Sequence, residues 1–308
     1  MGARWVVGAV VLATAMMPTQ IAVGAAPVEA PDRIELPDGW QPEGITAHRE
    51  LLYVGSLADG AIWEADSATG EGRVFVEGQS GQVAVGVHFD PRRNLLWVAG
   101  GDTAELRAYD ADSGELLRTY EFPSEDSRFL NDVAVLRGFV YVTDSLQQEL
   151  GVVRLRGELP PPSAATTLPL TGDLEYGEGF NLNGIVRANR ELFSVQSGTG
   201  LLFQIDEHTG ETVEVDLGGE LLTNGDGLES DHGIVYAVRN SDNLIAAVEL
   251  AADGETGEVS AELTDDDLDV PTTVAKSRGL LWAVNARFST PPTPETSYWI
   301  TRLEKYSD

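Results

Sequence analysis

Six short segments along the chain share one pattern, in which an aromatic residue stands third among aliphatic and small residues. Alternation of this kind is typical of β-strands rather than of helices. The aromatic residues are Tyr53, Trp97, Tyr141, Phe193, Tyr236 and Trp282. We therefore predict that each segment is the second strand of a unit that repeats along the chain.

A shorter apolar strand precedes each aromatic strand, and its aliphatic anchor repeats in step. The anchors are Ile45, Val87, Val133, Ile185, Leu228 and Val274. Further strands and glycine-containing turns follow, which gives about four antiparallel strands per unit. Repeats of roughly 40–50 residues with four strands each are typical of propeller blades. The pattern predicts an all-β fold, a six-bladed β-propeller.

The last unit has only three strands, because the sequence ends at residue 308. Residues 33–36 precede the first unit and offer the missing strand. We expect this N-terminal strand to pair with the last blade and close the ring, since closure removes exposed sheet edges. A two-domain β protein is the alternative, and the regular spacing of the aromatic strands argues against it.

The first 25 residues are typical of a secretion signal. Arg4 precedes a mostly apolar run to Met17, and a run of small residues around Ala25 offers a cleavage site. An uncleaved anchor is the alternative. We expect cleavage after Ala25, secretion, and one propeller domain over residues 26–308.

Charge and composition narrow the classes of partner. The chain has 20 basic and 50 acidic residues, for a net charge of −30. Such a surface repels phosphate backbones, so nucleic acid is excluded as a partner, whereas cations are compatible with it. No cysteine is present, which excludes disulfides and thiolate metal sites. We expect a monomer that acts on a small molecule, with no membrane contact in the mature form.

Polar residues recur two positions before the aliphatic anchors. In order, these positions hold Glu43, Val85, Asn131, Asn183, Asp226 and Thr272. The first strand of a blade lies innermost in a propeller, so these positions form a ring around the axis. Polar side chains in a narrow channel cost free energy unless they find partners. Carboxylate and amide oxygens are the ligands that Ca²⁺ prefers, and the ring has no sulfur or imidazole for zinc, copper or iron.

These residues predict a Ca²⁺ site formed by Glu43, Asn131, Asn183 and Asp226. A hydrogen-bonded polar ring around water, without a metal, is the alternative. That alternative leaves Glu43 and Asp226 uncompensated.

The four ligand motifs, PEGI, LNDVAV, LNGIV and DGL, resemble those of the gluconolactonase, regucalcin and diisopropyl fluorophosphatase family of six-bladed calcium propellers. The resemblance covers roughly residues 33–305, and the motifs fall in units one, three, four and five, as the family's calcium ligands do. Relatives that act on organophosphates carry a histidine in the last blade's channel position. Here that position is Thr272, so the substrate is not carried over.

The resemblance implies a calcium-dependent hydrolase of the lactonase type, with Asp226 as general base or nucleophile. A channel Ca²⁺ polarises a carbonyl or phosphoryl oxygen and lowers the pKa of bound water. We expect substrate contacts from Asp144, Arg239, Thr272 and Asn285, and a lid from residues 286–297, in which Phe288 offers an apolar wall. A non-catalytic propeller that binds a ligand or a protein and uses the ion structurally is the alternative.

Overall fold

The computed structural model describes residues 1–3, 5 and 30–306, and residues 33–304 form a ring of six sheets whose strands are antiparallel apart from one short parallel pair. The expected signal segment lies almost entirely outside the described residues, as does its cleavage site after Ala25. Within the described ranges, no helix is both long enough and apolar enough to cross a membrane. The six-bladed propeller predicted from the repeats is confirmed.

Strands are arranged in chain order within each of the first three blades. The first blade consists of β2 (Pro42–His48), β3 (Leu51–Ser56), β4 (Ile62–Asp66) and β5 (Gly72–Val76). The second consists of β6 (Val87–Asp90), β7 (Leu95–Ala99), β8 (Glu105–Asp110) and β9 (Leu116–Glu121). The third consists of β10 (Leu130–Leu136), β11 (Phe139–Asp144), β12 (Glu149–Arg154) and β13 (Ala165–Pro169), with the 3₁₀ turn η1 (Pro162–Ala164) before its last strand.

The fourth blade has an addition that the repeat did not predict. Its strands are β15 (Leu182–Ala188), β16 (Glu191–Gln196), β17 (Leu201–Ile205) and β18 (Glu211–Glu214). The short strand β14 (Thr171–Gly172) pairs in parallel with β18 and makes this sheet five-stranded. The fifth blade consists of β19 (Gly225–Asp231), β20 (Ile234–Arg239), β21 (Leu244–Leu250) and β22 (Gly257–Leu263), with the turn η2 (Asn240–Asp242) after β20.

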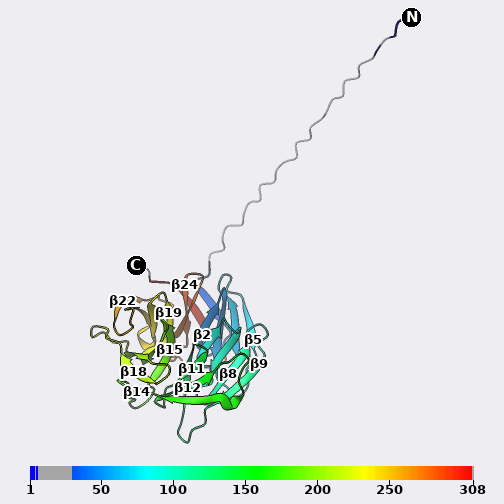
Figure 1. The fold of residues 1–308 in the computed structure, drawn as a ribbon. Helices are drawn as coiled ribbons and strands as arrows, with labels where there is room; N and C mark the ends of the chain where they lie inside the picture. Colours follow the sequence, from blue (N-terminus) through cyan, green and yellow to red (C-terminus); the bar gives the residue numbers. More distant parts are fainter. Residues whose placement is uncertain (4, 6–29, 307–308) are drawn as a thin grey trace.

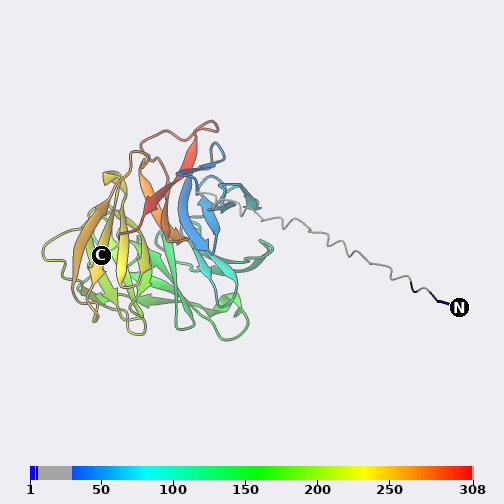
Figure 2. The same ribbon diagram turned by 90° about the horizontal axis from the view of Figure 1, so that it is seen from above.

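The ring closes as the sequence predicts. The sixth blade contains β23 (Pro271–Ser277), β24 (Leu280–Asn285) and β25 (Tyr298–Glu304), and the N-terminal β1 (Arg33–Leu36) pairs antiparallel with β25. Figure 2 shows this blue N-terminal strand beside the red C-terminal one. In Figure 1 the first strands β2, β15 and β19 lie near the middle, and outer strands such as β5, β9 and β22 lie at the rim.

Aromatic residues of the second strands hold neighbouring blades together. All six are at most 2% exposed. Trp97 packs in a cluster with Val133 and Val140 of the next blade, and Trp282 packs with Ile45 and Leu52 across the closure. Each aromatic side chain therefore fills the wedge between its own blade and the one that follows. Burial of this much apolar surface is the dominant favourable term in the fold.

Candidate functional site

The polar ring lies where the innermost strands bulge. In blades one, three, four and five, two residues of the first strand stand opposite one residue of the second strand. The first residue of each pair is the predicted ligand, namely Glu43, Asn131, Asn183 or Asp226. A bulge adds a residue and redirects its side chain, and bulges recur beside active sites. The bulges explain how four strands direct a polar side chain toward the axis without losing their pairing.

In three of the four bulged blades the residue after the ring position is glycine, because the innermost strands almost touch there. A Cβ atom on Gly44 would stand 2.2 Å from the Val85 carbonyl oxygen, and one on Gly184 would stand 2.3 Å from the Asp226 carbonyl oxygen. Glycine without a Cβ is the residue that allows such an approach. The glycines of the PEGI and LNGIV motifs are therefore needed for contact between neighbouring blades.

Asp132 takes the corresponding position in the third blade and is a polar residue that the sequence did not single out. Its carboxylate accepts hydrogen bonds from the backbone N–H groups of Val133, at 2.8 Å, and of Ile185, at 3.0 Å. Burial raises the pKa of Asp132 to about 7. With both oxygens bonded to backbone, Asp132 joins blades three and four.

The two ring carboxyl groups are buried close to each other. Glu43 is 6% exposed and Asp226 is 3% exposed. Burial raises the pKa of Glu43 well above its ordinary range, and the nearby Asp226 carboxylate raises it further. Burial also raises the pKa of Asp226 to about 7, opposed by the hydrogen bond from Asn240. Two like charges in one dry channel repel each other, and a proton or a cation relieves the repulsion.

Ser145, Ser197 and Asn240 each form a hydrogen bond with one ring side chain and fix its orientation. The Asn131 amide nitrogen donates to the Ser145 hydroxyl at 3.0 Å, and the Asn183 amide nitrogen donates to the Ser197 hydroxyl at 3.3 Å. Both serines follow the second strand of their blade by one residue, and each hydroxyl in turn donates to a carbonyl of the next blade. Because each amide nitrogen is held on one side, the amide oxygen is left for other partners.

Asp226 is held in the same way, by the residue that follows β20. The Asn240 side-chain nitrogen donates to Asp226 Oδ2 at 2.8 Å. Asp226 Oδ1 is buried and forms no hydrogen bond of normal length and angle with the described residues, while the Asn183 amide and the Gly227 backbone N–H lie close enough to the carboxylate to lower its pKa. A buried carboxylate oxygen without a donor costs free energy, so it marks a place where a ligand or an ion would be bound favourably.

Carboxyl groups alone do not form a metal cluster in the part of the chain that the structure describes. No group of three or more histidine, cysteine, aspartate or glutamate side chains there is placed to hold a metal ion. The predicted set is of another kind, with two carboxyl and two amide side chains. These donors suit a hard cation such as Ca²⁺, and calcium binding stays a prediction.

The four residues predicted to contact substrate are all bonded to protein. Asp144 is fully buried and pairs with Arg128 at 2.9 Å. Arg239 pairs with Asp242 at 2.7 Å, and the Thr272 hydroxyl donates to the Glu43 carbonyl oxygen at 2.6 Å. Asn285 donates to the Thr301 hydroxyl at 2.9 Å. Their role toward a substrate stays a prediction.

An aromatic pair at the ligand end of the channel was not predicted. Phe129 and Phe180 precede the ring positions of blades three and four by two and three residues, and their rings meet edge to face at 4.9 Å. Phe180 is 52% exposed, and Phe288 in the predicted lid segment is 57% exposed. Exposed aromatic side chains beside a polar site are a common source of apolar contact for a ligand.

Comparisons with known proteins show the fold. No protein-family model and no curated protein matches the sequence. The major allergen Mala s 1 of Malassezia sympodialis matches with a TM-score of 0.72 and 15% identity, over 89% of this chain and 96% of that chain.

Two further solved structures are similar at lower scores. A Bacteroides thetaiotaomicron protein of unknown function has a TM-score of 0.60 and 13% identity, over 92% of this chain and 71% of that chain. A PQQ-bound aldose sugar dehydrogenase from Streptomyces coelicolor has a TM-score of 0.54 and 13% identity, over 91% and 96%. At these identities the likeness supports the propeller fold alone, and membership of the gluconolactonase-like family stays a prediction.

Proposed function

We propose that the ring of Glu43, Asn131, Asn183 and Asp226 binds Ca²⁺ and that the protein hydrolyses an ester, most simply a lactone. The observation that carries the proposal is Asp226 Oδ1, a buried oxygen without a hydrogen-bond donor, next to a second carboxyl group. The Ser145 and Ser197 hydroxyls accept hydrogen bonds from the Asn131 and Asn183 amide nitrogens, and the Asn240 amide donates to Asp226 Oδ2, so three of the four ring side chains are oriented by neighbours. Neighbours that orient ligands in this way are typical of metal sites.

Ca²⁺ bound there would balance the two carboxylates and polarise a carbonyl oxygen. Asp226 supplies the protein's own chemistry. With Oδ2 held by Asn240, Oδ1 is the atom that accepts a proton from water as the water attacks the ester carbonyl, or that attacks the carbonyl itself. Phe129 and Phe180 offer an apolar contact for the acyl part.

The expected secretion fits this proposal. Outside the cytoplasm calcium is abundant, and extracellular modules bind it with dissociation constants of about 10⁻⁴–10⁻³ M. A site with two carboxylates and two amides needs no greater affinity to be occupied there. We therefore include export in the proposal.

A non-catalytic propeller with a structural Ca²⁺ is the second candidate, and burial favours it. Glu43, Asn131 and Asp226 are each at most 6% exposed, and the residues expected to touch substrate have protein partners instead. In this case the ion stabilises the ring, and the exposed mouth binds a ligand without reaction.

A hydrolysis screen separates the two candidates. The purified protein is tested with lactones, aryl esters and phosphotriesters, with and without Ca²⁺, beside Asp226→Asn and the control Asp266→Asn, which changes an exposed acid. We expect Asp226→Asn to lower turnover at least about 100-fold, as the loss of a general base does, with the fold intact. Unchanged turnover in Asp226→Asn contradicts the catalytic role. Calcium stabilisation without turnover of any substrate favours the second candidate.

A further inference from the structure

Arginine side chains gather at the opposite end of the channel, where each first strand turns into the second. Five of the six inner turns carry arginine. These residues are Arg49, Arg92, Arg93, Arg137, Arg190 and Arg278. The fifth blade has His232 at this place. In a chain with 50 acidic and 20 basic residues, such a concentration of positive charge is unexpected.

Several of these arginines occupy a backbone conformation that arginine seldom adopts. Arg49, Arg137, Arg190 and Arg278 have φ angles between 50° and 75°. Glycine, asparagine and aspartate are the residues usually found at positive φ in tight hairpin turns. Such a conformation persists only where the surrounding structure imposes it, and strained residues cluster at active and binding sites.

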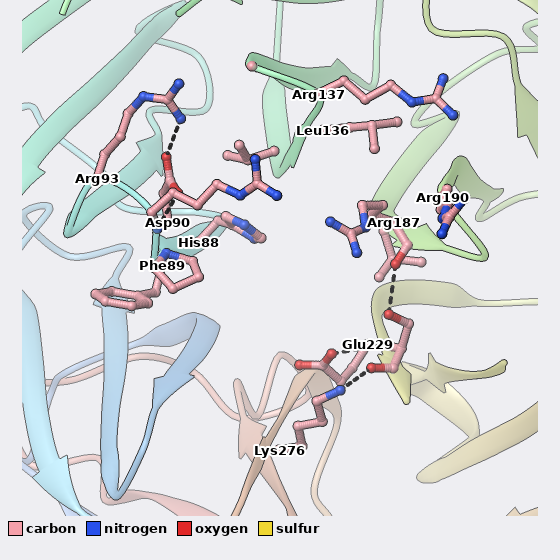
Figure 3. A pocket seen from close by; sticks show the side chains of 16 residues that line it. His88, Phe89, Asp90, Arg93, Leu136, Arg137, Arg187, Arg190, Glu229 and Lys276 are labelled. Atoms are coloured by element: carbon pink, nitrogen blue, oxygen red, sulfur yellow. Dashed lines mark hydrogen bonds and ion pairs between the residues drawn. The ribbon is translucent and has the colours of Figure 1, made fainter. Parts of the chain in front are cut away.

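A cavity of about 590 Å³ opens among these turns. Six basic side chains line it, from Arg92, Arg93, Arg137, Arg187, Arg190 and Lys276, against the two acidic side chains of Asp90 and Glu229. Figure 3 shows Arg187 and Arg190 on one side, with His88, Asp90 and Arg93 across from them and Lys276 below. A second cavity of about 260 Å³ adjoins it, shares several lining residues, and extends to the aliphatic anchors and Arg49.

Some of the positive charge is already balanced by protein carboxylates. Arg93 pairs with Asp90 at 3.0 Å, Lys276 pairs with Asp231 at 3.1 Å, and Arg137 pairs with Glu207 and Glu191. Among the described residues, no carboxylate forms an ion pair with Arg92, Arg187 or Arg190.

The remaining polar groups of the cavity do not cancel that charge. Glu229 accepts a hydrogen bond from the Ser230 backbone N–H at 2.8 Å and interacts with Lys276, so its charge is set against the lysine and not against the three arginines. Burial and the neighbouring Arg187 lower the pKa of His88 to about 4, so at neutral pH His88 is an uncharged donor and acceptor. The cavity therefore presents free guanidinium groups beside a neutral imidazole.

We propose that this cavity binds a small phosphate monoester with an apolar body. Arg92, Arg187 and Arg190 offer forked donors that match phosphate oxygens. A phosphate monoester carries a charge of about −1.5 to −2 and three terminal oxygens, and so matches several guanidinium groups better than a monocarboxylate does. The apolar side chains of Phe89, Leu136 and Val186, which also line the cavity, suit the rest of the ligand. The volume falls within the range of small-molecule sites.

The net charge of the protein restricts the ligand to a small molecule. A surface of net charge −30 repels a long polyanion, and the basic side chains of this site are grouped around a single opening. The site is independent of the proposed hydrolase, because it uses the opposite ends of the first strands and none of the ring side chains.

Calorimetric titration with phenyl phosphate at low ionic strength tests the proposal. We expect one site per chain, stronger binding than with inorganic phosphate or benzoate, and weaker binding as salt is added. Arg187→Gln and Arg190→Gln should each weaken binding about tenfold or more, because hydrogen bonds between charged groups are lost. Both side chains are exposed, so the melting temperature should not change.

Arg156→Gln is the matched control, because Arg156 is also exposed and has no ion pair in the described structure. It should bind phenyl phosphate as the unchanged protein does, and so should Asp226→Asn. Failure of the unchanged protein to bind phenyl phosphate overturns the proposal. So does equal weakening by Arg156→Gln and Arg187→Gln.

Discussion

The two ends of the central channel are made from the two ends of the same six strands, yet their chemistry is opposite. Where the first strands begin, bulges direct Glu43 and Asp226 inward, and burial disfavours their negative charge. Where the same strands end, turns carry arginines around a cavity. The aliphatic anchors lie between the two ends. The overall charge of −30 therefore says little about what either end binds, since local arrangement decides it.

The largest effect expected at the acidic end is on stability as pH changes. The folded-state pKa of Asp226 is about 7, above its ordinary value of 3.8, so the folded state holds more protons between these pH values than the unfolded state does. In the presence of a chelator, stability should therefore be greatest at low pH within this window and fall as pH rises, by about 1 kcal/mol per pH unit from this group. Urea unfolding from pH 4 to 7 measures it.

Asp226→Asn is the control for this titration, because its amide does not ionise. The slope of stability against pH should be shallower in the variant, and added Ca²⁺ should reduce the slope in the unchanged protein. An identical slope in Asp226→Asn would show that repulsion in the ring is not its source.

A close contact between blades at the acidic end can be tested with one methyl group. In Gly184→Ala the new Cβ atom would stand 2.3 Å from the Asp226 carbonyl oxygen and 2.7 Å from the Leu228 nitrogen. Because both neighbours are backbone atoms, we expect a loss of about 3 kcal/mol in the free energy of unfolding. Gly198→Ala is the control, since nothing lies within 4 Å of its Cβ position. Equal melting temperatures for the two variants would refute the close approach.

The smallest effect concerns the residues that orient the ring. Ser145→Ala removes the acceptor that holds the Asn131 amide nitrogen. Calcium affinity should fall about tenfold, as with other residues that orient metal ligands. Ser113→Ala in an outer hairpin is the control, and phenyl phosphate binding at the basic end should be the same in both variants. Unaltered calcium affinity in Ser145→Ala would show that the serine does not orient a metal ligand.

Much of the fold could be predicted because the propeller repeats one local pattern. The aromatic residues such as Trp97 and Trp282 mark each second strand, and the missing fourth strand of the last blade leaves only residues 33–36 to close the ring. The four ring residues could also be matched to one another from the sequence, because each stands two positions before the aliphatic anchor of its blade. The extra strand β14 has no counterpart in other blades, so the repeat contained no signal for it.

The details of the site depend on geometry that a sequence does not display. A bulge looks like any other strand residue until its partner strand is known, so the part that Asp132 and the glycines beside the ring play in contacts between blades could not be predicted. Side chains alternate along a strand, and a shift of one residue changes the face. Asp144 is the last residue of β11, and its carboxylate pairs with Arg128. Ser145, one residue later, accepts a hydrogen bond from the ring residue Asn131. The arginines of the inner turns can be seen to recur in the sequence, but the cavity that they share can be found only in the folded structure.

Calcium titration of the purified, chelator-treated protein tests the central claim most directly. We predict one Ca²⁺ per chain by calorimetry, a rise in melting temperature on its addition, and loss of both in Asp226→Asn. Heat and melting temperature that do not change with Ca²⁺, together with no calcium found by metal analysis, would contradict it and leave a hydrogen-bonded polar ring.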